Sequence, residues 1–299
     1  MTSPCVALQP RPRRPTGFSL FELLMALGVL ALFIGPVLLL FAQLQKTYAG
    51  TQGRIQSQAA ARSALSLMAE EIELAGSNPT VDTTTAAAVG PCATPCAISF
   101  ASGAGLNDGD VIALDIGSNF EQIPVAVSNA SYTATPIKAH AVGSIVVYPG
   151  YPYATGVCPA NSSGVSGCSA SKLQFFGNIY GDNKLYFVEY VYDAANQRIT
   201  RSVTALTAAS KSPAYSICDN VIAASFNVAR DAQGNDSSIT LQITVQTPYL
   251  DPETRQFATF SLQRGVIQAR NVAIASQMAA AANSSNIAPT PAAISNFVP

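Results

Sequence analysis

The chain has 299 residues, of which 48% are hydrophobic and only 11% are charged. A chain of this length and composition can bury a core in one large domain or two modest ones, which excludes a protein that is disordered throughout. The net charge is −1 and the sequence carries no basic stripe. Nucleic-acid binding, which depends on neutralising phosphates, is therefore not expected.

The apolar residues concentrate in one block near the N-terminus. Between residues 18 and 42 the only ionisable side chain is Glu22. As a helix rising about 1.5 Å per residue, this block would cross the hydrocarbon core of a bilayer. Arg11, Arg13 and Arg14 precede it, and basic flanks stay cytoplasmic. The predicted anchor is a single span with its N-terminus inside and the rest of the chain facing the periplasm or the exterior.

A glycine precedes the apolar block and an acid follows that glycine by five residues. Residues 14–24 read RPTGFSLFELL, whereas an ordinary secretory signal peptide has its cleavage site after the apolar stretch. The string resembles the class III leader of type IV prepilins and of type II secretion pseudopilins, which prepilin peptidase cuts and methylates. The resemblance implies a cleaved leader at 1–17, a cut between Gly17 and Phe18, and N-methylated Phe18.

Glu22 is the candidate assembly residue. An ionised carboxylate in hydrocarbon is costly unless it is paired, so an acid there is a functional hypothesis. In the family that the leader resembles, this Glu meets the N-terminal amine of a neighbouring subunit. Two charges about 4 Å apart attract by about 4 kcal/mol at an effective dielectric near 20, before desolvation is subtracted. The plainer alternative is a single-pass anchor in which Glu22 snorkels toward the membrane surface.

The helix is expected to continue beyond the transmembrane and assembly segment 18–42. Pro36 predicts a kink or a short unwound segment. Segment 43–76 forms an amphipathic stem, whose apolar positions recur every three or four residues: Ala61, Leu65, Met68, Ile72 and Ala75. Gly76 supplies a stop. Residues 62–76 also resemble the stem end of PilW-type minor pilins and of J-type pseudopilins.

The remainder predicts a β-rich, mainly antiparallel head at 77–279, which makes the fold class α+β. Residues 239–246 and 258–263 alternate apolar and polar side chains, as half-buried strands do. Segments 77–96 and 149–171 are expected to be loops, and 280–299 a disordered tail. The other predicted strands are 111–116, 144–148, 173–176, 185–192, 199–203 and 221–228.

Five cysteines lie beyond the leader. The simplest assignment pairs Cys92 with Cys96 and Cys158 with Cys168 and leaves Cys218 over, although sequence alone does not fix connectivity. An extracytoplasmic head permits disulfides. Zinc is the competing reading of Cys92 and Cys96, but the ligand set is incomplete.

No enzyme site is predicted. The only histidine is His140, which is expected on the surface, and no nucleophile elbow or phosphate loop accompanies it. Asp108 and Asp110 lack the following acid of a calcium loop and predict a strand-entry turn. We expect no catalytic residue, metal or cofactor.

The resemblance therefore implies a minor pilin of a type IV pilus, contributing to pilus assembly or to the filament tip. Its partners would be other pilins in a helical filament, prepilin peptidase and the inner-membrane assembly platform. It would move from the inner membrane to a filament in the periplasm or at the cell surface. Two alternatives stay open, namely a minor pseudopilin of a type II secretion system and a membrane-tethered periplasmic binding or adhesion protein.

Overall fold

The computed structural model describes residues 19–102, 106, 108–129, 131–232, 234–251, 254–281 and 286–298. The chain divides into two compact units, residues 1–52 and residues 53–299. One helix, α1 (Leu20–Glu73), contributes its first part to the first unit and its second part to the second. The leader and the predicted cleavage position at Gly17 and Phe18 lie outside the described residues.

In the first unit, α1 is helical without interruption and passes through Pro36. The expected unwound segment is therefore absent from the helix. A proline deprives the helix of one backbone hydrogen bond, but the turns on either side of Pro36 remain helical. Large apolar side chains between Leu20 and Leu44 are exposed in this unit.

In the second unit, the last turns of α1 form part of the head. The buried positions recur at helical spacing, with Ala61, Met68 and Ile72 fully enclosed. Gly76 has a φ of +75° and its N–H donates to the Phe176 carbonyl at 2.8 Å. This confirms the predicted glycine stop, because a left-handed conformation ends a helix at little cost only with glycine.

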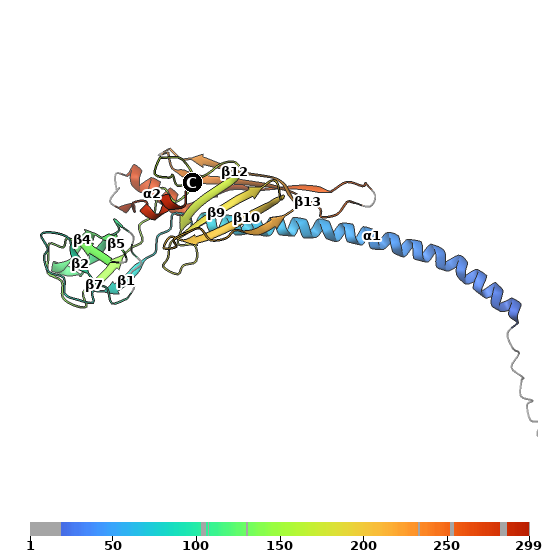
Figure 1. Ribbon diagram of the computed structural model, residues 1–299, viewed down its shortest axis with the longest axis horizontal. Helices are drawn as coiled ribbons and strands as arrows, with labels where there is room; N and C mark the ends of the chain where they lie inside the picture. Colours follow the sequence, from blue (N-terminus) through green and yellow to red (C-terminus); the bar gives the residue numbers. More distant parts are fainter. Residues whose placement is uncertain are drawn as a thin grey trace, which may run out of the picture. The chain divides into compact units, whose positions relative to one another are not determined.

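Strands β1–β7 form two small antiparallel sheets, with strand orders β1-β7-β3-β4 and β2-β6-β5. Ile112, Leu114 and Val146 lie at their core. In Figure 1 the labelled strands β1, β2, β4, β5 and β7 gather in one group. The elements are β1 (Val81–Thr84), β2 (Cys96–Ile98), β3 (Val111–Leu114), η1 (Gly117–Asn119), β4 (Glu121–Pro124), β5 (Ala126–Ser128), β6 (Ser131–Ala134) and β7 (Ile145–Tyr148).

Strands β8–β14 form two larger antiparallel sheets, with orders β11-β10-β9-β8 and β12-β13-β14. Their buried faces and the second part of α1 share one apolar core, which includes Phe175, Leu241 and Ile243. Figure 1 shows α1 running beside β9 and β10. The strands are β8 (Lys172–Gly177), β9 (Tyr186–Asp193), β10 (Arg198–Ala205), β11 (Tyr215–Asp219), β12 (Val221–Arg230), β13 (Asp236–Gln246) and β14 (Thr259–Gln268).

The C-terminal segment is ordered where it is described, so the prediction of a disordered tail at 280–299 is wrong for residues 286–298. Helix α2 (Arg270–Ala280) is followed by the short helix η3 (Ala292–Asn296). Ile294, Phe297 and Val298 are buried, and the Phe297 ring stacks on Phe187 at 5.7 Å. Low charge and abundant Ala, Ser and Pro predict disorder, but three buried apolar side chains near the end of the chain are enough to dock a short tail.

The predicted fold class is confirmed as a long N-terminal helix followed by a β-rich antiparallel head. Every strand expected from alternation or from a β-rich run is present. The strands that sequence reasoning missed are short, such as β2 and β5, or lie in predicted loops, such as β1. The compact unit begins at Gly53 and not at residue 77, because the stem supplies part of its core.

Candidate functional site

The N-terminal end of α1 carries the candidate assembly residue. The Ser19 N–H donates to Glu22 Oε2 at 3.1 Å, and the Phe21 N–H donates to Ser19 Oγ at 3.4 Å. This reciprocal pattern is a capping box, in which a serine before the helix and a glutamate three residues later satisfy free backbone donors. Ser19 and Glu22 have the three-residue spacing of this motif, so the sequence already contains the signal for it.

The side chains of α1 that follow Glu22 are apolar and exposed. The next charged residue is Lys46, and side chains such as Leu32 and Leu39 are more than 70% exposed. Among the described residues, α1 is the one helix long and apolar enough to cross a membrane, and the side chains of its apolar stretch are exposed. A continuous exposed apolar surface of this extent is typical of a segment that contacts lipid or other proteins.

A buried ion pair fastens the second part of α1 to the head. Glu71 of α1 pairs with Arg201 of β10, and both side chains are less than 10% exposed. Arg201 Nε donates to Glu71 Oε2 at 3.1 Å, and the Tyr190 hydroxyl donates to the same oxygen at 2.5 Å. Burial, together with the Glu71 charge, raises the pKa of Tyr190, so this hydroxyl stays a donor. The cluster ties the stem to β9 and β10.

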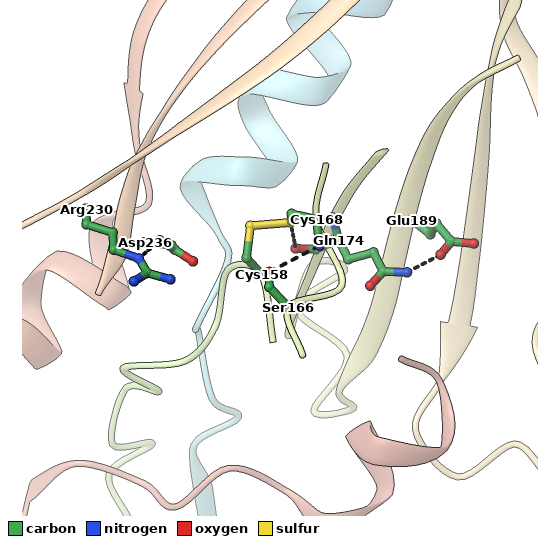
Figure 2. Close-up of a disulfide and its surroundings, with 7 residues drawn as sticks. All are labelled: Cys158, Ser166, Cys168, Gln174, Glu189, Arg230 and Asp236. Atoms are coloured by element: carbon green, nitrogen blue, oxygen red, sulfur yellow. Dashed lines mark hydrogen bonds and ion pairs between the residues drawn. A yellow bond between two sulfur atoms is a disulfide. The ribbon is translucent and has the colours of Figure 1, made fainter. Parts of the chain in front are cut away.

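The two disulfides join the cysteine pairs that the sequence favoured. Cys92 is bonded to Cys96 with a Cα–Cα separation of 6.2 Å, and Cys158 to Cys168 with 5.3 Å. Figure 2 shows the second bond beside Gln174, whose amide donates to Glu189 of β9. The Gln174 backbone N–H also approaches Cys168 Sγ at 3.3 Å. This disulfide therefore holds the loop before β8 against that strand.

Cys218 is the free cysteine of the described chain, and it is buried in β11. Burial, with a smaller contribution from the Asp219 charge, raises the pKa of Cys218 to about 11. A thiol that stays protonated at neutral pH is a poor nucleophile and a poor metal ligand. Cys218 therefore has the properties of a small core residue.

His140 is buried, so the prediction that it lies on the surface is wrong. Its side chain has no solvent exposure, with Nε2 at 3.1 Å from Glu121 Oε2 and Nδ1 at 3.5 Å from Asp115 Oδ2. Sequence reasoning could not place it, because the residues around His140 give no periodic signal and its partners lie 19 and 25 positions away. The imidazole is held between two acids inside the small sheets.

The two acids beside His140 have lowered pKa values. A hydrogen bond from the Ser144 hydroxyl is the largest influence on Asp115 and lowers its pKa. Burial raises the pKa of Glu121, but hydrogen bonds from the Ile137 N–H and from His140 outweigh it and leave the pKa lowered. Both carboxylates are therefore ionised at neutral pH and act as hydrogen-bond acceptors in the folded small sheets.

Neither the cysteines nor the acids form a metal site within the described ranges, where no three His, Cys, Asp or Glu side chains are placed to share an ion. Asp108 accepts a hydrogen bond from the Val127 N–H at 2.9 Å. Asp110 is buried and accepts one from the Tyr148 hydroxyl at 2.8 Å. These contacts give both acids structural roles at the entry to β3.

No protein-family model, curated protein or solved structure matches this chain.

Proposed function

We propose that the chain is a prepilin-like minor pilin, which prepilin peptidase processes and which takes part in assembling a type IV pilus or its tip. The observation that carries the proposal is the N-terminal arrangement of Gly17, Phe18 and Glu22 directly before an exposed apolar helix. Lipid would surround this helix before assembly, and the helices of other subunits would surround it afterwards. The head would then remain outside the membrane.

The capping geometry supports a role for Glu22 in assembly. Cleavage after Gly17 would leave a positive amine on Phe18, directly before the helix terminus at Ser19. A helix N-terminus carries partial positive charge and disfavours a cation there. In a single chain, Glu22 is engaged by the Ser19 N–H. Glu22 of a neighbouring subunit would neutralise the charge of the Phe18 amine. This pairing would fix the position of each added subunit relative to the previous one in the filament.

The head supports an extracytoplasmic location. Two disulfides fasten surface loops at 92–96 and 158–168, and disulfides persist in oxidising compartments such as the periplasm. The basic residues Arg11, Arg13 and Arg14 precede the apolar block and favour an N-terminus that stays in the cytoplasm. Both features agree with a subunit that waits in the inner membrane with its head outside.

Intact mass and N-terminal sequencing of the membrane-extracted protein test processing, in cells with and without prepilin peptidase. The expected chain begins at N-methylated Phe18 only when the peptidase is present. A chain that retains residues 1–17 in both strains would refute the proposal.

Glu22→Gln tests assembly separately from processing. The amide keeps the size of the side chain and can still accept the Ser19 hydrogen bond, but it cannot offset an amine charge. We expect the variant to be cleaved and membrane-bound, and to be reduced at least about tenfold in sheared filaments, since 1.4 kcal/mol corresponds to a factor of ten. Glu22→Asp is the matched control, because it retains the charge. Equal incorporation of Glu22→Gln and the native chain would contradict the assigned role.

A further inference from the structure

Strand β14 has an open edge. It is the last strand of the sheet β12-β13-β14 and pairs with β13 alone. The Thr247 N–H donates to the Ala258 carbonyl, so alternation along an antiparallel ladder turns the backbone groups of Thr259, Ser261 and Gln263 away from β13. Within the described chain, these outward groups have no backbone partner. Such a row is a template for another strand.

The exposed edge lacks the usual protection against pairing. Residues 259–263 contain no proline and no charged residue, which are the residues that commonly block edge strands. The ladder stays regular until the register shifts opposite Arg264, and a shift of this kind ends regular pairing. The open stretch is therefore six residues long, or about 20 Å at the usual rise of a strand.

A groove of about 740 Å³ lies between this edge and α1. Its lining contains two guanidinium groups and no carboxylate, because it is formed by Arg62, Ser63, Leu65, Ser66, Ser261, Leu262, Gln263 and Arg264. Arg62 and Arg264 are exposed, and neither forms a salt bridge with any described residue, whereas Arg54, Arg198, Arg201, Arg230 and Arg270 do. The lining is therefore positively charged, and the nearby Glu70, which accepts a hydrogen bond from the Ser66 hydroxyl at 3.4 Å, forms no salt bridge with either arginine.

The core beneath the edge is incompletely covered. Phe260 and Leu262 face the main apolar core but are only partly buried. A strand added beside β14 would place alternate side chains over these two residues and over the groove. An apolar side chain beside Leu262 would extend the cover, and an acidic one two positions further along the same face, beside Arg264, would reach the two arginines.

We propose that the β14 edge and the adjoining groove bind an extended acidic strand of a partner protein. Backbone hydrogen bonds from Thr259, Ser261 and Gln263 supply affinity, and Arg62 and Arg264 select a carboxylate flanked by apolar residues at alternate positions. A second copy using the same edge fits less well, because it would bring its own unpaired Arg264 into a groove that is already positive. This binding does not depend on whether the leader is processed.

A pair of synthetic peptides tests the charge selection on the full chain in detergent micelles. The fluorescent peptide TVTETVT places Val, Glu and Val on one face of a strand, and TVTKTVT replaces the acid by lysine. We expect the glutamate peptide to bind at least about tenfold more tightly in fluorescence anisotropy. The double variant R62E/R264E should invert this preference. Equal affinity of the two peptides for the native chain would overturn the proposal.

Ser261→Pro tests the strand addition. Proline removes an N–H that points away from β13, so the existing ladder is kept, whereas an added strand loses a donor. Ser261→Ala is the matched control, since it retains the N–H. We expect binding of TVTETVT to fall at least about tenfold in Ser261→Pro and to be unchanged in Ser261→Ala, with thermal unfolding of both near that of the native chain.

Methylated peptides test strand addition on the native chain, so this test does not depend on whether Ser261→Pro folds. N-methylation of the TVTETVT amides that face β14 should abolish binding, and N-methylation of the other amides should not. Equal binding of both methylated peptides would overturn strand addition. Sedimentation of the detergent-solubilised chain tests whether a second copy of this chain occupies the β14 edge instead. If the chain forms a dimer that R264E stabilises, the edge binds a second copy, and the proposal of an acidic partner is overturned.

Discussion

Removing Glu71 should destabilise the head strongly, because Arg201 would keep its charge in a buried position. The Arg201 side chain is 6% exposed and is held by Glu71 and by the Tyr180 hydroxyl at 3.2 Å. Deleting one partner of a buried ion pair typically costs about 3–5 kcal/mol, since the remaining charge is unpaired. For a domain of this size, each kcal/mol lowers Tm by about 2–4 °C. Glu71→Ala should therefore lower Tm by roughly 6–20 °C.

Thermal unfolding of the detergent-solubilised chain, followed by circular dichroism in the β region, measures this effect. The matched control is Arg198→Ala, which breaks the surface pair with Asp193, where Arg198 is 43% exposed. Exposed pairs contribute at most about 1 kcal/mol. A Tm loss for Glu71→Ala no larger than that of the control would refute the reasoning.

A triple variant separates the unpaired charge from the lost packing. Glu71→Leu, Tyr190→Phe and Arg201→Met together replace the polar cluster by apolar side chains of similar size. Buried ion pairs exchanged in this way are often neutral or even stabilising. The triple variant should therefore retain more stability than Glu71→Ala alone. If it is less stable than the single variant, the cost comes from the contacts and not from the charge.

Two further predictions concern the small sheets and the tail. Because the folded pKa values of Asp115 and Glu121 are lowered, their stabilising effect is present above the unfolded values near 4 and is lost as pH falls through the folded values. Between pH 7 and pH 2, the free energy of unfolding should fall more steeply below about pH 4. The double variant Asp115→Asn with Glu121→Gln should show a shallower fall in this range. The same curve for the variant and the native chain would contradict the assignment. Phe297 is 3% exposed, and Phe297→Ala should cost about 3–5 kcal/mol in chemical denaturation, whereas a loss below about 0.5 kcal/mol would show that the tail does not dock as described.

The capping box changes what a Glu22 substitution can report. Glu22 satisfies a helix-terminal donor in the single chain, and loss of such a cap costs about 1 kcal/mol. Glu22→Ala would therefore combine a frayed helix with a lost charge. Glu22→Gln keeps an acceptor for the Ser19 N–H, which is why it isolates the charge.

Features that depend on neighbouring residues could be predicted from the sequence. The apolar helix, the glycine that ends it and the alternating strands follow from periodicities of 3.6 and 2. The cysteine pairs could be anticipated because they are four and ten positions apart and a short loop brings its ends together easily. Glu22 was recognisable because a lone acid stands out in an apolar block.

Features that depend on distant residues were decided by the tertiary structure. Glu71 and Arg201 are 130 positions apart, and only the packing of α1 on β10 brings them together. The same holds for His140 between its two acids and for Phe297 against Phe187. The open β14 edge also emerged only from the strand order. Local spacing reports which face of an element is apolar, but which element covers that face is set by the folded chain as a whole.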